Sequence, residues 1–121
     1  MNYTTQEQSK KLLELGLDPS TADMYYDKQT NIVYIALTKG FKTDWCFPCW
    51  STDRLLDLMP KPLEYQGSFC YPELDLFTHR ISYTVGAADY IEFDGVDNLD
   101  SSYKMMIWLL KNNYIKQNKH D

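Results

Sequence analysis

The sequence predicts an α+β fold, and three observations carry that prediction. Leucines recur at helical spacing near the start of the chain, β-branched and aromatic residues alternate between residues 74 and 93, and an amphipathic helical pattern returns near the end. We therefore expect a small antiparallel sheet packed by an N-terminal helix, a short middle helix and a C-terminal amphipathic helix. With 121 residues, the chain is expected to form a single domain, 1–121, whose core folds without disulfides or a metal.

Two helical signals open the chain. Thr4 and Glu7 have the spacing of a capping box, and Gly16 ends the leucine-rich helix that follows them. Asp18 then provides an N-cap immediately before a proline, which favours a second short helical turn ending near Tyr25. The first half of the chain should therefore begin with one helix and one further turn.

Two segments have the residue pattern of strands. Residues 32–37 are β-branched and apolar almost throughout, which predicts a central strand buried on both faces. Residues 74–93 alternate with period two, and residues 86–88 are the natural turn of a hairpin. Both segments are expected in the same antiparallel sheet.

Two further helices are predicted from their caps. Ser51 is a good N-cap for a helix that Pro60 ends. Asn98 is the expected N-cap of the last helix, and residues 113–121 are expected to form a polar tail. The apolar stripe of the last helix is predicted to consist of Leu99, Tyr103, Met106 and Leu110.

Composition and charge restrict the classes of partner. The chain has 17 acidic and 12 basic residues, giving a formal charge of −5, which disfavours nucleic acid and anionic lipid surfaces. The sequence has neither an apolar run long enough for a membrane span nor a signal-peptide pattern, so we expect no membrane partner and a cytoplasmic location. In that compartment Cys46, Cys49 and Cys70 are expected to be reduced.

One motif has the spacing of a redox site. Residues 45–49, Trp-Cys-Phe-Pro-Cys, resemble the active-site motif of thioredoxin-like proteins, which places its first cysteine at a helix N-terminus. Here the best N-cap is Ser51, after both cysteines, so the helix dipole would do little to activate Cys46. A thiol redox protein, with Cys46 as attacker and Cys49 as resolver, stays open as an alternative.

Metal binding is a second alternative. The side chains that would form a tetrahedral Cys₃His zinc site are Cys46, Cys49, Cys70 and His79. The separation of the last two ligands is looser than in ordinary zinc sites, and the predicted core needs no metal, so we expect no cofactor. Residues 89–100 contain five carboxylates, which we assign to helix capping and solvation rather than to a cation.

Aromatic residues are the remaining unusual feature. The chain has ten Tyr, five Phe and three Trp, and several of them fall in segments predicted to be irregular. Tyr and Trp are favoured at interfaces because they bury a large area and keep a polar tip. The candidates for contacting a protein partner are Trp45, Phe47, Trp50, Tyr25 and Tyr26.

Three segments, residues 5–17, 48–60 and 103–115, carry a further resemblance. They resemble small uncharacterised proteins encoded by prophages and mobile elements of Bacteroides-type gut bacteria. The resemblance implies no activity and no catalytic residues, but it implies a setting in which small acidic proteins bind host or phage proteins. We therefore predict a non-enzymatic interaction protein, an accessory or inhibitor of a host factor, with a homodimer as an open alternative.

Overall fold

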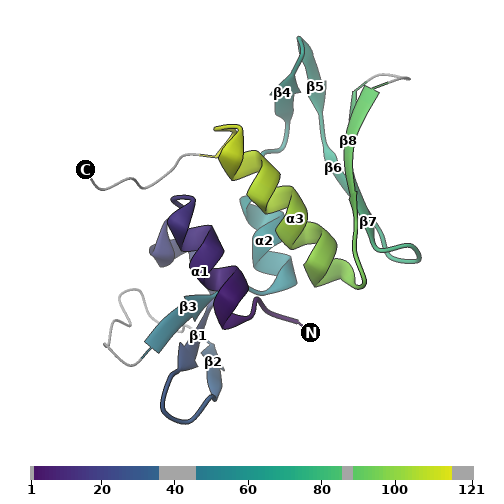
Figure 1. Ribbon diagram of the computed structural model, residues 1–121. Helices are drawn as coiled ribbons and strands as arrows, with labels where there is room; N and C mark the ends of the chain where they lie inside the picture. Colours follow the sequence, from purple (N-terminus) through teal and green to yellow (C-terminus); the bar gives the residue numbers. More distant parts are fainter. Residues whose placement is uncertain (1, 36–45, 86–88, 116–121) are drawn as a thin grey trace.

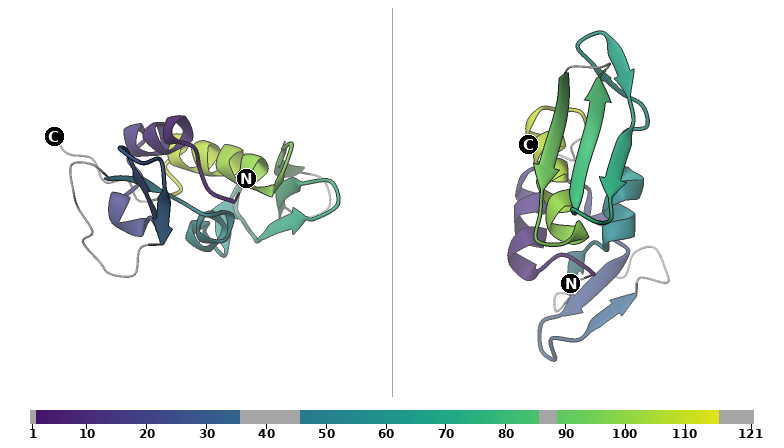
Figure 2. Two further views of the ribbon diagram at one scale, coloured as in Figure 1. Left: turned by 90° about the horizontal axis from the view of Figure 1, so that it is seen from below. Right: turned by 90° about the vertical axis from the view of Figure 1, so that its right-hand side faces the viewer.

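The structure is a computed structural model that describes residues 2–35, 46–85 and 89–115. Helices lie between two antiparallel sheets of three strands each, one at either end of the molecule (Figure 1). The same separation is seen from below and from the side (Figure 2). The predicted α+β class is confirmed, although the described strands form two such sheets and a separate hairpin rather than one sheet.

The described residues form three α-helices, one 3₁₀ turn and eight strands. The helical elements are α1 (Gln6–Glu14), the 3₁₀ turn η1 (Pro19–Thr21), α2 (Thr52–Leu58) and α3 (Asn98–Lys111). The strands are β1 (Met24–Asp27), β2 (Val33–Ile35), β3 (Cys46–Cys49), β4 (Leu63–Tyr65), β5 (Ser68–Cys70), β6 (Pro72–Asp75), β7 (Arg80–Val85) and β8 (Asp89–Asp94). The first sheet has the strand order β2-β1-β3, the second sheet has the order β6-β7-β8, and β4-β5 is a separate hairpin.

The capping box of α1 lies one residue later than predicted. Thr5 Oγ1 accepts the N–H of Gln8 at 3.1 Å, and Gln8 Oε1 accepts the N–H of Thr5 at 2.9 Å. Thr4 is not a cap, because its buried hydroxyl accepts the N–H of Trp50 at 3.0 Å. The contact ties the start of the chain to a residue 46 positions away, which local sequence patterns do not reveal.

The end of α1 agrees with the prediction. Gly16 adopts a φ of 96°, a conformation that costs glycine little and other residues more. Its N–H donates to the carbonyl of Leu13, and the N–H of Leu17 donates to the carbonyl of Leu12. These are the two bonds of a Schellman motif, and the accompanying pair of buried leucines joins the helix end to the core.

The first sheet corrects two predictions. The helical turn expected to reach Tyr25 ends at Thr21, and the aromatic segment after it becomes β1, the central strand. The strand predicted to be central and buried is instead β2 at the edge, where the side chain of Ile35 is 68% exposed. Apolarity marked residues 32–37 as a strand, but only its pairing with β1 decides that this strand lies at the edge. Residues 36 and 37 lie outside the described residues.

The second half of the chain contains two hairpins that the sequence did not predict, β4–β5 and β6–β7, and the second divides the single strand expected from residue 74 to residue 85. In the β4–β5 hairpin, Gln66 and Gly67 form a two-residue turn with φ values of 50° and 80°. The predicted pairing of β7 with β8 is confirmed, and the turn expected at residues 86–88 lies outside the described residues. Ser51 caps α2 as predicted, with its hydroxyl accepting the N–H of Arg54 at 3.1 Å.

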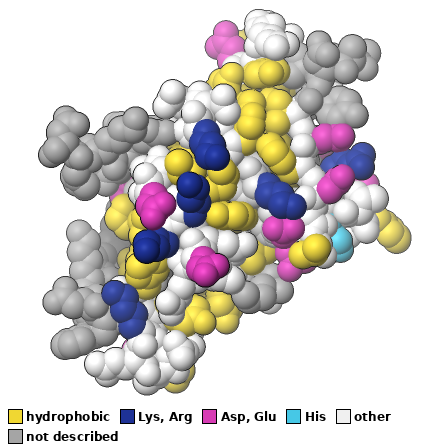
Figure 3. All heavy atoms as spheres, in the orientation of Figure 1, with side chains coloured by type: hydrophobic (Ala, Val, Ile, Leu, Met, Phe, Trp, Pro, Cys, Tyr) yellow, Lys and Arg dark blue, Asp and Glu magenta, His cyan; other side chains and the backbone are white. Residues whose placement is uncertain are grey.

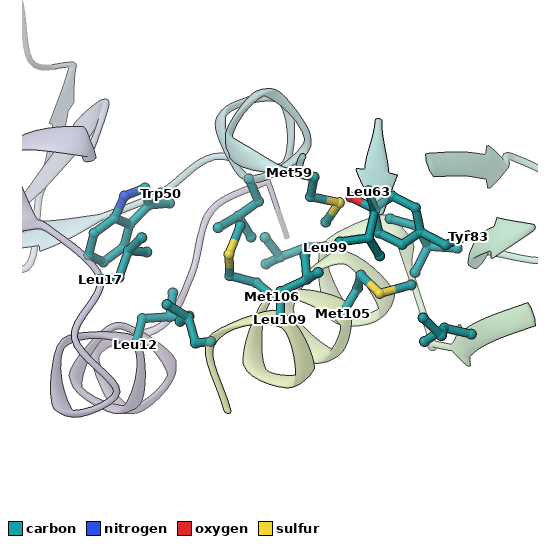
Figure 4. Packing of buried hydrophobic residues seen from close by; sticks show 14 of the residues in the cluster. Leu12, Leu17, Trp50, Met59, Leu63, Tyr83, Leu99, Met105, Met106 and Leu109 are labelled. Atoms are coloured by element: carbon teal, nitrogen blue, oxygen red, sulfur yellow. The ribbon is translucent and has the colours of Figure 1, made fainter. Parts of the chain in front are cut away.

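Helix α3 is the centre of the core (Figure 4). Its N-cap is Asp97 rather than Asn98, because the Asp97 carboxylate accepts the N–H of Asp100 at 2.8 Å. Tyr103, predicted on the apolar stripe, is only partly buried. The buried face is wider than that stripe because α3 packs on α1, α2 and the second sheet. It consists of Leu99, Ser101, Ser102, Met105, Met106, Leu109 and Leu110.

The segment after α3 stays against the protein up to the last described residue. The ring of Tyr114 stacks on Trp108 at 5.3 Å between centroids, and both rings contact Tyr65 edge-on. Ile115 also packs against the core. The first residues of the predicted tail, 113–115, therefore lie on the protein, and residues 116–121 are outside the described residues.

Candidate functional site

The two cysteines of the redox motif lie at opposite ends of β3. Cys46 pairs with Asp27 and Cys49 pairs with Met24 of the neighbouring strand β1. Side chains alternate along a strand, so residues three apart point to opposite faces, and their Cα atoms are about 10 Å apart. A disulfide needs Cα atoms within about 7 Å. The strand therefore keeps these cysteines apart, and their predicted roles as attacker and resolver are not supported by the geometry.

The thiol of Cys49 is also unsuited to nucleophilic chemistry. It is buried, and burial together with the nearby carboxylate of Asp23 raises the pKa of Cys49 to about 12. At neutral pH the side chain is the protonated thiol, not the thiolate that attacks disulfides. The buried thiol of Cys70 lies 3.2 Å from the carbonyl oxygen of Leu63, to which it can donate. Both side chains are parts of the core.

The predicted zinc ligands do not come together. Cys46, Cys49, Cys70 and His79 all belong to the described part of the chain, and no group of three or more His, Cys, Asp or Glu side chains in that part is arranged to hold a metal ion. Cys49 and Cys70 belong to different sheets, and His79 lies in the turn after β6. The five carboxylates of residues 89–100 likewise form no such group where their side chains are described.

The aromatic residues around the cysteine motif do not form one exposed patch. Trp50 is 0% exposed, and its indole N–H donates to the hydroxyl of Thr21 at 3.0 Å, so it is a core residue and not part of a binding surface. Phe47 lies in a strand rather than in the irregular loop that we predicted. Trp45 lies outside the described residues.

The two tyrosines of β1 point to different faces of the first sheet. Tyr25 and Tyr26 are consecutive strand residues, so their side chains alternate. The ring of Tyr26 lies edge-on to that of Tyr3 at 6.5 Å, on the same face as Phe47, its partner in β3. These aromatic side chains are half-buried and help to pack the sheet.

A different apolar surface is far more exposed. Leu76 and Phe77, in the turn between β6 and β7, are 69% and 97% exposed, and Val96, in the loop before α3, is 87% exposed. We call these three residues the apolar tip. His79 Nδ1 lies 2.7 Å from Oδ1 of Asn98, which holds the turn beside the start of α3. In Figure 3, hydrophobic side chains project beyond the cyan side chain of His79.

Hydrogen bonds fix the backbone of this turn. Asp75 Oδ1 accepts the N–H groups of Phe77 at 2.9 Å and Thr78 at 3.3 Å. The N–H of His79 donates to the carbonyl of Asp75 at 2.8 Å, and His79 takes a left-handed φ of 57°. Histidine is among the residues enriched in that conformation. The turn is thus defined by its first and last residues, and Leu76 and Phe77 are held outward between them.

The turn between β1 and β2 has the same construction. Asp27 Oδ1 accepts the N–H groups of Gln29 at 2.9 Å and Thr30 at 3.4 Å. The N–H of Asn31, whose φ is 59°, donates to the carbonyl of Asp27 at 2.8 Å. The positions that correspond to Leu76 and Phe77 are occupied by Lys28 and Gln29. The same backbone therefore forms with a polar pair in one turn and an apolar pair in the other.

Carboxylates flank the apolar tip on the outer face of the second sheet. The strand register places Asp75, Arg80 and Asp94 side by side in one row, and Glu73, Ser82 and Glu92 in the next. Arg80 Nε lies 2.6 Å from Oδ1 of Asp94. Hydrogen bonds from the N–H groups of Phe77 and Thr78 hold the pKa of Asp75 below its ordinary value, so its carboxylate is charged at neutral pH.

Comparison with known protein families, with curated proteins and with solved structures gave no match. None of the helices among the described residues has the length and apolarity of a membrane-spanning segment. The site therefore has to be argued from its own geometry.

The sequence reading missed the apolar tip, although the sequence contains a signal for it. The pattern Asp-x-x-Thr-Asn at residues 27–31 returns as Asp-x-x-Thr-His at residues 75–79. Asp favours turns because its carboxylate accepts backbone N–H groups, and Asn or His tolerates a positive φ. Reading both segments as turns would have placed Leu76 and Phe77 at an exposed position. The period-two pattern of residues 74–93 predicts a strand at Leu76 instead.

Proposed function

We propose that the chain is a non-enzymatic protein that binds a protein partner through the apolar tip and acts as an accessory or inhibitor of that partner. The single observation that carries this proposal is the pair of matching turns. Since the turn at residues 27–31 forms around Lys28 and Gln29, the same backbone does not require Leu76 and Phe77. Large apolar side chains that folding does not need are best explained by a contact outside the chain.

The geometry of the apolar tip suits such a contact. Burying a side chain of this size in an apolar pocket contributes about 1.5–3 kcal/mol. The turn is already ordered by the bonds to Asp75, so docking costs less conformational entropy than it would for a flexible loop. A projecting aromatic residue that fills a pocket is a common form of binding hot spot. The proposed origin in a prophage or mobile element rests separately on the resemblance of three segments.

The decisive variant, called the exchanged tip, replaces the two turn residues of the apolar tip by their polar counterparts, Leu76→Lys with Phe77→Gln, and leaves Val96 unchanged. The wild type and the variant are immobilised, and proteins captured from a cell lysate are compared by quantitative mass spectrometry. We expect at least one protein to be retained by the wild type and reduced about tenfold or more with the variant, a change equivalent to about 1.4 kcal/mol. Capture of the same proteins in equal amounts by both would contradict the proposal.

Two controls keep this experiment interpretable. The exchanged tip should leave the free energy of unfolding within about 0.5 kcal/mol of the wild type, because an exposed position on an unchanged turn contributes little to folding. The matched control is Lys28→Ala with Gln29→Ala in the other turn, which should leave capture unchanged. Lower capture with both variants would point to an effect that is not specific to the apolar tip.

A further inference from the structure

The outer face of the second sheet adjoins the apolar tip and is open to solvent. Figure 2, right, shows β6, β7 and β8 facing the viewer with the helices behind them. Ile81 and Tyr83 of β7 are buried toward the helices, so the residues that alternate with them, Arg80 and Ser82, stand on the opposite face. A sheet covered on one side normally has a polar outer face. Here the charged groups of the outer face are mostly negative.

Four carboxylates and one guanidinium stand on this face. The carboxylates are those of Glu73, Asp75, Glu92 and Asp94, and the guanidinium is that of Arg80. Arg80 contacts Asp94 at 2.6 Å and Glu92 at 3.6 Å, both on β8. Within the described part of the chain, Glu73 takes part in none of the salt bridges. The β6 side of the face is therefore the more negative side.

The spacing of the β6 carboxylates suits an extended partner. Glu73 and Asp75 are alternate residues of one strand, so their side chains stand about 7 Å apart on the same face. Alternate side chains of another extended segment have the same spacing. Together with Arg80 and Ser82, these residues line a shallow hollow, and the turn that follows it carries Phe77.

We infer that the partner contributes an extended basic segment, in which Lys or Arg side chains meet Glu73 and Asp75 while a neighbouring large apolar residue contacts Phe77. This inference rests on the proposed function and specifies the chemistry of the partner. Charge complementarity carries it, since the carboxylates of the face exceed its basic groups by three and adjoin an exposed apolar anchor. Opposite charges at the rim of a contact mainly raise the association rate and select the partner.

The test uses a displayed library of random peptides, selected on the wild-type chain and then screened against Leu76→Lys with Phe77→Gln. Some peptides will bind the wild type but not the variant with the exchanged tip. Their affinity for the Glu73→Lys variant is then measured. The matched control is Glu64→Lys, which makes the same change of charge on an exposed glutamate of β4. We expect these peptides to carry Lys or Arg within two residues of a large apolar residue. Glu73→Lys should weaken them about fivefold or more, and Glu64→Lys less than about twofold.

The outcomes separate this inference from the function on which it rests. One outcome is that the selected peptides depend on the apolar tip but lack basic residues, and another is that they bind Glu73→Lys as tightly as they bind the wild type. Either result would contradict the inferred basic segment and leave the proposal of binding through the apolar tip intact. If no selected peptide distinguishes the wild type from the exchanged tip, both ideas fail. Equal weakening by Glu73→Lys and Glu64→Lys would show attraction to the overall charge, which also overturns the inference.

Discussion

The turns at residues 27–31 and 75–79 are alike in backbone and opposite in the chemistry of their exposed residues. Each begins with an aspartate whose carboxylate accepts two N–H groups, and each ends with a residue at a φ near 60°. In the first turn, Lys28 bends back so that its ammonium group lies 5.4 Å from the centre of the Phe47 ring. In the second, Phe77 projects almost entirely into solvent.

The difference separates what folding requires from what it leaves free. The first and last residues of each turn satisfy backbone groups and set the backbone path, so both turns use the same kinds of residue there. The hydrogen bonds described for the two turns do not use the side chains at the second and third positions, which are Lys28 and Gln29 in one turn and Leu76 and Phe77 in the other. A large apolar pair in that position is therefore unexplained by the fold, and this is why the apolar tip supports a proposal about function.

The largest expected effect is on the free energy of unfolding, when a buried aromatic residue, Trp50, and the exposed Phe77 are each replaced by alanine. Trp50→Ala should lower the free energy of unfolding by about 3–5 kcal/mol, because it empties a fully buried site and removes the bond to Thr21. Phe77→Ala should change it by less than about 0.5 kcal/mol, since the ring is exposed. Urea denaturation followed by circular dichroism measures both.

Trp50→Phe provides a milder control if Trp50→Ala does not fold. It keeps an aromatic ring and leaves the Thr21 hydroxyl without its indole partner, and we expect a cost of about 1–3 kcal/mol. A loss above about 1 kcal/mol for Phe77→Ala would mean that the ring supports the fold. The comparison between the two turns would then no longer indicate a binding role.

The next largest effect is expected when the residue with a left-handed φ in each turn, His79 or Asn31, is replaced by valine. His79→Val should cost about 1–3 kcal/mol, because a β-branched side chain is strained at a φ of 57° and the contact with Asn98 is lost. Asn31→Val should be destabilising for the same backbone reason, but by less, since among the described residues the Asn31 side chain has no hydrogen bond like that of His79 to lose. Thermal denaturation of both variants measures the difference.

Asn31→Gly and His79→Gly are the matched controls for backbone strain. Glycine accepts a positive φ without steric cost, so Asn31→Gly should stay close to the wild type. His79→Gly should lose only the stability contributed by the hydrogen bond between His79 and Asn98. If the two valine variants are as stable as the wild type, the turns do not have the strained geometry on which the comparison rests.

The smallest effect concerns the carboxylate of Asp75 and its pH dependence. Hydrogen bonds from Phe77 and Thr78 lower the pKa of Asp75 in the folded state. The stability that the ionised group contributes is fully present above its unfolded pKa of about 4 and is lost as the pH falls through the lower folded value. The small advantage of the wild type over Asp75→Ala should therefore be constant near neutral pH and shrink below about pH 4.

Asp75→Asn separates charge from hydrogen bonding at this position. An asparagine keeps an oxygen that can accept the two N–H groups but does not ionise over this range. Its stability relative to Asp75→Ala should therefore not vary with pH. Denaturation series at several pH values compare the three proteins, and a wild-type advantage that grows on acidification would contradict the lowered pKa.

Local sequence signals predicted much of the fold but less of the candidate site. The end of α1 at Gly16, the cap at Ser51 and the β7–β8 pairing follow from short-range chemistry and are found in the structure. The order of strands does not follow from it, because β1 and β2 are both apolar and only their partners decide which is central. The same limit applies to Trp50, which local reasoning placed on a binding surface.

By itself, the sequence determined the α+β class, the caps at Asp18 and Ser51 and the helix end at Gly16, because each depends on residues within a few positions of one another. The two Asp-x-x-Thr turns are equally local, although we did not predict them, and the caps of α1 and α3 lie one residue from the predicted positions. Only the tertiary structure decided which aromatic residues are buried and which project. Burial depends on contacts between distant segments, such as the bond from Trp50 to Thr4 and the packing of α3 on two helices and a sheet. Among the described residues no such distant contact is found for Phe77, and its side chain is exposed.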